Sequence, residues 1–209
     1  MEALLHAVDP DGNPDTPDGA QVINLSLGSL DRMRVVDAVA RLASCAAPEP
    51  GDPIADQTDP AYDGDRRRCA ADGGAVVVAA AGNDASDKLR EYPAAEGSYG
   101  LLAVGASTAA RTVAAFSNRG NWVQALAPGE GITSALPGGA WGVWSGTSMA
   151  APLAAGVVAL VRAQQPLAAP RAVVRGLVRS AAPLCGTLIG QVDAAAALGL
   201  PPAAAPVCR

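Results

Sequence analysis

The feature that most constrains the fold is an uninterrupted apolar run, AVVVAAA, at residues 75–81. A strand with one face in solvent alternates apolar and polar side chains, whereas this run offers no polar face. Gly82-Asn83 follows at once and ends it at a length typical of a buried strand. The run therefore predicts a parallel strand that is covered on both faces, as in α/β proteins.

Other apolar segments alternate with helical periodicities along the chain. Aromatic residues make up only 3% of the sequence, so Ala, Val and Leu must build the core. The alternation predicts an α/β fold of three layers with a mostly parallel central sheet. Further strands are predicted at residues 21–27, 101–104 and 123–127, a hairpin at 132–144, and helices at 2–8, 31–43, from 147 or 148 onward, and at 170–181.

The charge distribution argues against two classes of partner. There are 15 Lys and Arg against 20 Asp and Glu, a net charge of −5, and the one basic cluster, residues 66–68, follows two aspartates. A chain of this kind lacks the basic surface that nucleic acid or an anionic membrane would require. No apolar stretch reaches the ~20 residues of a membrane span, and the first residues do not resemble a secretory signal.

Four cysteines allow three disulfide pairings. Cys45 and Cys69 flank a Pro- and Asp-rich insert, and Cys185 and Cys208 flank the C-terminal segment, which favours pairing in sequence order. Two disulfides would indicate an oxidising compartment, and the alternative is four free thiols in a reducing one.

The sharpest local motif is GTSMAAP at residues 146–152. A hydroxyl at the first turn of a helix, here Ser148, lies where free N–H groups and the helix dipole favour a developing negative charge. Pro152 is expected to be tolerated because it falls in the first turn. Taken alone, Ser148 is equally well explained as a helix N-cap.

A second motif supplies a partner for that serine. Asn83 follows the 75–81 strand, at the edge of the sheet where α/β proteins bind ligands, and its NH₂ group can donate to an oxyanion beside the N–H of Ser148. The alternative is a simple turn residue. A third segment, VINLSLG at residues 22–28, is a strand that ends in glycine and could pair with an extended peptide.

These three blocks, in this order, resemble the subtilisin-like serine proteases, the subtilase family. The resemblance covers nearly the whole chain: residues 1–200 would form the C-terminal portion of a catalytic domain, with a surface insert at 45–69 and an irregular tail at 201–209. It implies an endopeptidase in which Ser148 is the nucleophile and Asn83 the oxyanion donor. The substrate side chain before the scissile bond would lie between Ser26, Leu27 and Gly28 on one side and Ala80, Ala81 and Gly82 on the other, in a roomy apolar pocket.

Two members of the family's catalytic triad have no counterpart here. The Asp and the general-base His of subtilases precede the VINLSLG strand, and the only histidine, His6, lies in a segment that matches a helix instead. The resemblance therefore suggests an N-terminally truncated chain, with a sheet that is incomplete on its N-terminal side, inactive alone and in need of a complementary upstream segment. A split protease completed by another chain is the alternative to truncation.

Two other functions compete with this one. An α/β-hydrolase would need G-x-S-x-G and a histidine after the serine, and neither is present. A non-catalytic, peptide-binding scaffold of the subtilase type remains the alternative. Family habit and the cysteine pairs place the protein outside the cell or in the cell envelope, acting on proteins or peptides.

The chemistry itself requires no cofactor, but a structural calcium ion is a further expectation. Asp9, Asp11, Asn13 and Asp15 occur at every second position, and Asp18 follows. Such hard oxygen ligands suit Ca²⁺, although the spacing departs from that of an EF-hand. The alternative is a solvated acidic turn.

Overall fold

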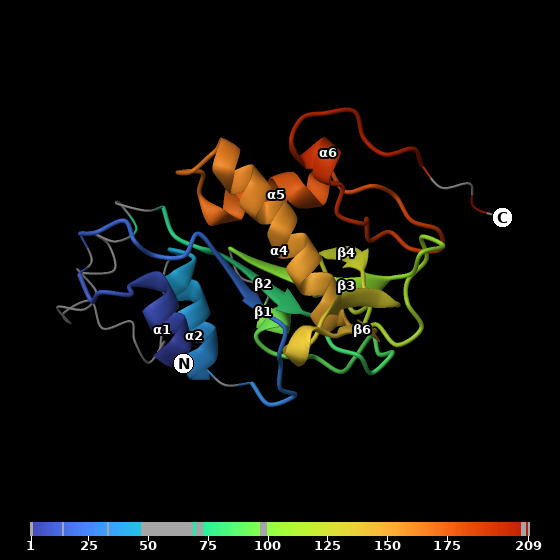
Figure 1. The fold of residues 1–209 in the computed structure, drawn as a ribbon, viewed down its shortest axis with the longest axis horizontal. Coiled ribbons are helices and arrows are strands. Elements are labelled where there is room, and N and C mark those ends of the chain that lie inside the picture. The colour runs from blue at the N-terminus through green and yellow to red at the C-terminus, as the bar shows by residue number, and fades with distance from the viewer. Residues whose placement is uncertain are drawn as a thin grey trace.

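The computed structural model describes residues 2–13, 15–32, 34–46, 69, 73–96, 100–205 and 208. Their centre is a parallel sheet in the order β1-β2-β3-β4, so neighbours in the sheet are also consecutive in sequence (Figure 1). β2 and β3 are buried on both faces, as the apolar run predicted. The four strands are β1 (Val22–Leu25), β2 (Val76–Ala80), β3 (Leu101–Ser107) and β4 (Ala125–Pro128).

Helices cover both faces of this sheet. Val77 and Ala79 of β2 belong to a core shared with α1 (Glu2–Val8) and α2 (Arg34–Ala43). The alternate residues of β2 face a second core, shared with α4 (Thr147–Gln164) and α5 (Pro170–Arg179). The three-layer α/β prediction is therefore confirmed, whereas the expectation that the sheet is incomplete on its N-terminal side stays a prediction.

The long helix α4 runs across the sheet and contacts all four strands (Figure 1). This close approach is possible because the residues that face the sheet are small. Ala150, Ala151 and Ala154 are fully buried there. The alanines thus bring the start of α4 down to the sheet edge that holds the site.

Smaller elements complete the structure. β5 (Ile132–Ala135) and β6 (Trp141–Trp144) form the expected antiparallel hairpin around a short 3₁₀ turn, η2 (Pro137–Gly139). A second 3₁₀ turn, η1 (Ala94–Glu96), precedes β3. α6 (Ala194–Ala197) was not anticipated from the sequence. Residues 201–205 form no helix or strand, and the division into a domain and a tail stays a prediction.

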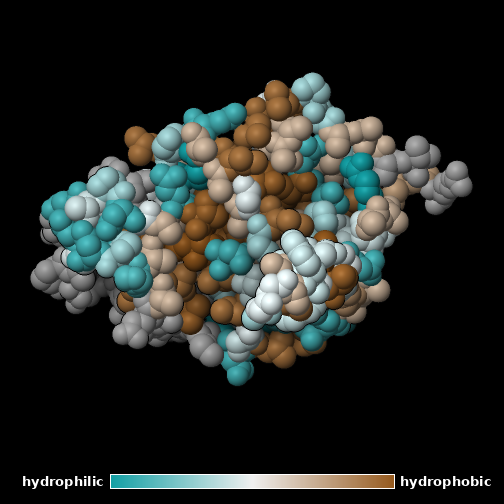
Figure 2. Space-filling view, in the orientation of Figure 1, coloured by the Kyte–Doolittle hydropathy of each residue, from teal (hydrophilic) through white to brown (hydrophobic). Residues whose placement is uncertain are grey.

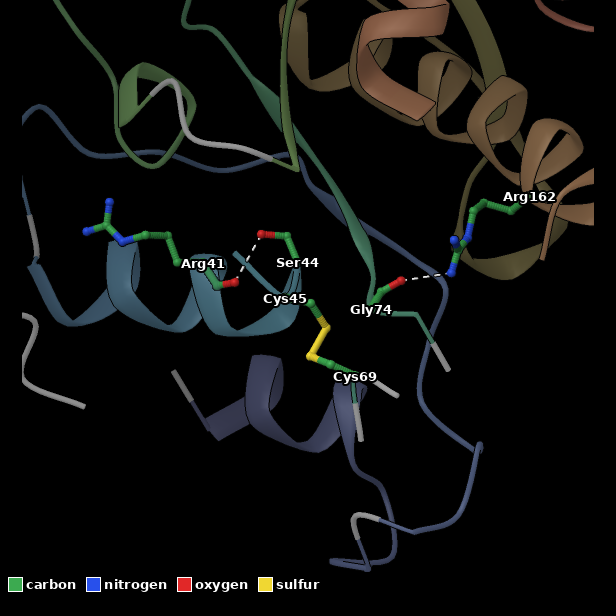
Figure 3. The surroundings of a disulfide bond; sticks show 6 residues. All are labelled: Arg41, Ser44, Cys45, Cys69, Gly74 and Arg162. Atoms are coloured by element: carbon green, nitrogen blue, oxygen red, sulfur yellow. Dashed lines mark hydrogen bonds between the residues drawn. A yellow bond between two sulfur atoms is a disulfide. The ribbon is translucent and has the colours of Figure 1, made fainter. Parts of the chain in front are cut away.

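Both predicted disulfides are present. Cys45, which follows the end of α2, pairs with Cys69 (Figure 3). Cys185 pairs with Cys208. Most of the predicted 45–69 insert, residues 47–68, lies outside the described residues. Within the described part of the chain, no helix has the length and apolar character needed to cross a bilayer.

Candidate active site

The site forms where β2 ends and α4 begins. The backbone N–H of Thr147 donates to Oδ1 of Asn83 at 2.8 Å, and the Thr147 hydroxyl donates to the same oxygen at 3.1 Å. The N–H of Gly82 in turn donates to the Thr147 hydroxyl at 3.2 Å. The residue next to Ser148 thus fixes the carboxamide of Asn83, although the two segments are more than 60 residues apart.

These contacts also settle which way the Asn83 carboxamide points. A backbone N–H can only donate, so the atom that faces Thr147 must be the carbonyl oxygen. The NH₂ group of Asn83 therefore points away from Thr147. The side chain is exposed, and no hydrogen bond from Nδ2 is found among the residues described. This NH₂ is left as a donor for a ligand.

Ser148 is the second residue of α4, and its side chain is half-buried. The helix N-cap is Gly146, and no side chain caps the helix. The alternative in which Ser148 serves as the N-cap is therefore wrong. The Ser148 hydroxyl instead donates to the carbonyl oxygen of Ser26 at 3.3 Å. The N–H of Ser148 belongs to the first turn, where amides have no acceptor within the helix.

Pro152 lies deeper in α4 than the sequence suggested. It is the sixth helical residue, beyond the first turn, so its missing N–H removes a regular bond to the carbonyl of residue 148. The Ser26 hydroxyl takes the place of that N–H and donates to the Ser148 carbonyl at 2.8 Å. The proline is tolerated because the end of β1 satisfies the carbonyl.

The two predicted walls follow neighbouring strands. Leu25 of β1 is in register with Ala79 of β2, so residues 26–28 lie beside residues 80–82. Ser26 is held by Nδ2 of Asn24 at 2.9 Å, and Leu27 is 63% exposed. Ala80 and Ala81 are buried, and Gly82 adopts φ +103°, which favours glycine. Within the described residues β1 is an edge strand, with one side open to a further strand.

Asn118 is a positioning residue that no sequence motif indicates. It is fully buried, and its Nδ2 donates to the Ala81 carbonyl at 3.0 Å, while its Oδ1 accepts from the N–H groups of Asp84 and Ser86. The side chain therefore shapes the loop that carries Asn83. The only signal was an amide in the SNRG segment, and no local pattern shows where it folds.

His6 does not join this site. It lies exposed in the last turn of α1, as expected of a helix-surface histidine. α1 belongs to the layer on the opposite face of the sheet from α4. The sheet therefore separates His6 from the helix that carries Ser148.

The acidic segment that follows α1 gathers three carboxylates. Oxygens of Asp9, Asp11 and Asp18 lie within 4.8 Å of one another, and Oδ1 of Asp9 is buried with no hydrogen-bond partner. Asn13 instead uses its Oδ1 to accept the N–H of Asp15. Hard carboxylate oxygens suit calcium, so Asp9, Asp11 and Asp18 have the chemistry to hold the expected ion, and the participation of Asn13 and Asp15 stays a prediction.

Known proteases are similar in fold over most of this chain. The self-cleaved protease domain of PatA matches 94% of this chain and 64% of its own, with a TM-score of 0.64 and 29% identity. The prenylagaramide maturation protease PagA matches 95% of this chain and 65% of its own at the same TM-score and 27% identity. The fold is therefore that of known proteases, of which this chain spans just under two thirds.

Sequence comparison identifies the family. The subtilase family model (peptidase S8) matches residues 2–199, and the chain belongs to that family. Subtilisin-like protease 7 of Trichophyton equinum is 48% identical over 95 residues, which is 46% of this chain and 23% of that protein. Subtilisin of Bacillus pumilus is 45% identical over 96 residues, 44% of this chain and 34% of that protein. The matched regions thus span only 23% and 34% of these two relatives.

Proposed function

We propose that this chain carries the nucleophile and the oxyanion site of a serine endopeptidase. The observation that supports this most strongly is the bond from the Thr147 N–H to Oδ1 of Asn83, since it brings a fixed carboxamide next to Ser148. A peptide-binding scaffold would need neither the hydroxyl nor the aimed NH₂ group.

In the proposed reaction, Oγ of Ser148 attacks the carbonyl carbon of the scissile peptide bond and loses its proton to a general base. The carbonyl oxygen becomes an oxyanion, to which the Asn83 NH₂ and the Ser148 N–H donate. The tetrahedral intermediate collapses, the amine leaves with the proton from the base, and an acyl-enzyme on Ser148 remains. Water then attacks the acyl-enzyme through the same steps and releases the carboxylic acid and the free serine.

The general base would come from outside the 209 residues. A serine hydroxyl without a base stays protonated near neutral pH and attacks slowly. The only histidine lies in the opposite helical layer, as described above. We therefore propose that an upstream segment, on the same or another chain, supplies the His and Asp. The 209 residues without that segment would be inactive.

The substrates would be proteins or peptides in an extended conformation. The open side of β1 offers backbone groups for strand addition, and the residues after it form one wall for the side chain before the scissile bond. The residues that end β2 form the other wall. The catalytic roles of Ser148 and Asn83 and the binding roles of Ser26, Leu27, Gly28, Ala80, Ala81 and Gly82 are parts of this proposal.

Two further elements belong to the proposal. Two disulfides are consistent with an oxidising compartment, and we infer a location outside the cell or in the cell envelope. A calcium ion held by Asp9, Asp11 and Asp18 would be structural and would neutralise the mutual repulsion of three carboxylates.

The experiment that tests the function joins this chain to the upstream segment of a close subtilase relative. The completed protein should hydrolyse peptides, and Ser148→Ala should abolish that hydrolysis. Full activity of the 209 residues alone would contradict the proposed need for an external base. If the completed protein binds peptides but does not cleave them, the scaffold alternative is favoured.

A further inference from the structure

The carboxylate of Glu91 lies between the two proposed walls. A Cβ placed on Gly28, after β1, would come within 2.5 Å of Oε2 of Glu91. A Cβ placed on Gly82, after β2, would come within 2.7 Å of Oε1. Each carboxylate oxygen therefore faces a glycine of a different wall, and side chains larger than hydrogen at either position would displace it.

Backbone pairing explains why Glu91 reaches this position. Ser29 and Tyr92 form an antiparallel bridge, in which the Ser29 N–H donates to the Tyr92 carbonyl at 3.0 Å and the Tyr92 N–H donates back at 2.8 Å. The Glu91 carbonyl also accepts from the N–H of Ala95 at 2.7 Å. The segment before the 3₁₀ turn η1 is thus fixed beside the end of β1, which makes the placement of the carboxylate a property of the fold.

Among the described residues, Glu91 has no positively charged partner. Asp84 is the charged neighbour that affects the pKa of Glu91, and in the described residues no Lys or Arg forms an ion pair with Glu91. The adjacent Arg90 turns away, with its guanidinium 5.5 Å from the ring centre of Trp122. Partial burial, and then the charge of Asp84, raise the pKa of the Glu91 carboxyl above its ordinary value. A bound cation would relieve both effects.

We propose that Glu91 makes this protein selective for Lys or Arg immediately before the scissile bond. The proposal rests on the proposed peptidase function, since it names the substrate class of the same site. It differs from the roomy apolar pocket that the sequence suggested, because the small residues of the walls enclose a carboxylate. A lysine or arginine side chain that enters between the walls would form a charge-assisted hydrogen bond with Glu91.

The same carboxylate would also exclude acidic side chains. Like charges held together in a partly buried space repel, and Asp84 adds a second negative charge on one side. A neutral substrate side chain would remove Glu91 from water without compensating its charge, which costs free energy. Glu91 would therefore act on specificity in two ways, by attracting cations and by penalising the alternatives.

The test uses the 209-residue chain and two small probes of nearly the same shape. p-Aminobenzamidine carries an amidinium cation, whereas p-aminobenzamide is neutral, so the ratio of their dissociation constants reports the charge contribution. We expect the wild type to bind the cation at least about 10-fold more tightly, as a charge-assisted bond implies. Glu91→Gln should bring the ratio close to one, and Glu91→Asp should retain part of the preference.

A control variant makes the result specific. Glu130→Gln removes an exposed acidic side chain elsewhere and should leave the ratio unchanged. Equal binding of both probes by the wild type, or a preference that survives in a folded Glu91→Gln variant, would overturn the inference.

Kinetics of the completed protein separate this inference from the function on which it rests. Cleavage of peptides with no preference for Lys or Arg over Leu would overturn the role of Glu91 and keep the peptidase. Probe selectivity in a completed protein that cleaves no peptide would refute the peptidase and keep the cation site. Melting curves of each variant show whether it folds.

Discussion

The hydroxyl of Ser26 donates to the carbonyl oxygen of Ser148 at 2.8 Å and joins the end of β1 to the first turn of α4. The Ser148 hydroxyl returns a contact to the Ser26 carbonyl at 3.3 Å. This reciprocal pair fixes the serine that we propose as nucleophile against the strand that we propose to bind the substrate. Pro152 makes the pair necessary, because a regular helix would satisfy the Ser148 carbonyl itself.

The first prediction concerns this pair. Ser26→Ala should lower the free energy of unfolding by about 1–3 kcal/mol, because it leaves a partly buried carbonyl without a donor. The cost should be smaller in a Pro152→Ala background, where the N–H of residue 152 can donate to the same carbonyl. Urea unfolding of the four variants measures this coupling.

Ser134→Ala, on the exposed strand β5, is the matched control and should change the stability little. If Ser26→Ala costs the same with and without Pro152, the proline does not account for the role of Ser26.

The second prediction concerns Asn83. Asn83→Asp keeps an oxygen that accepts the Thr147 N–H but loses the NH₂ donor. The loop should therefore keep its conformation, while kcat should fall. Loss of such a donor in subtilisin, a member of the same family, lowers kcat by about 10²–10³-fold, and we expect a loss of that order in the completed protein. Steady-state kinetics should show the effect in kcat with little change in KM. An unchanged kcat would remove Asn83 from the mechanism.

The third prediction concerns pH and Asp193, which caps the short helix α6. The N–H groups of Ala196 and Ala203 donate to its carboxylate, and these bonds hold the pKa of Asp193 below its ordinary value of 3.8. The ionised form is therefore favoured by folding. Its stabilisation is complete above pH 3.8 and is lost as the pH falls through the lowered pKa.

Asp193→Asn should accordingly be less stable than the wild type at pH 6, by about 1–3 kcal/mol, because a carboxamide offers only one oxygen to the two N–H donors. The difference should shrink as the pH falls below 3.8. Denaturation midpoints of both proteins between pH 2 and 6 measure this, and a difference that is constant across the range would contradict the assignment.

The fourth prediction concerns calcium. If Asp9, Asp11 and Asp18 hold the ion, a chelator should lower the melting temperature, because calcium at 100 times its dissociation constant stabilises the folded state by about 2.7 kcal/mol. Asp9→Asn combined with Asp18→Asn should abolish the calcium response. Asp15→Asn should preserve it, since Asp15 lies outside the carboxylate group. A melting temperature that does not change with calcium would indicate that these aspartates form a solvated turn without a bound ion.

The sequence predicted most of the fold because its strands are unambiguous. The run at residues 75–81 has no polar face, and the motif at 146–152 begins a helix where the structure begins α4. The short helix α6 was missed because four alanines carry no periodicity, and it depends on the cap from Asp193. Local patterns therefore sufficed for long elements and failed for an element that a single side chain stabilises.

The site was predictable only in part. Ser148 and Asn83 stand in motifs that can be read locally, and the structure places them on adjoining segments. The roles of Asn118 and Glu91 depend on contacts between segments far apart in sequence. A buried amide that holds a loop, or a carboxylate fixed by the bridge between Ser29 and Tyr92, leaves no pattern among its sequence neighbours.

The most direct test of the central claim is a crystal structure of the completed protein with a peptide boronic acid, which forms a tetrahedral adduct with a nucleophilic serine. We predict a bond from boron to Oγ of Ser148, with one boronate oxygen about 2.7–3.1 Å from both Nδ2 of Asn83 and the N–H of Ser148. An adduct on another residue, or a boronate oxygen that points away from Asn83, would contradict the account.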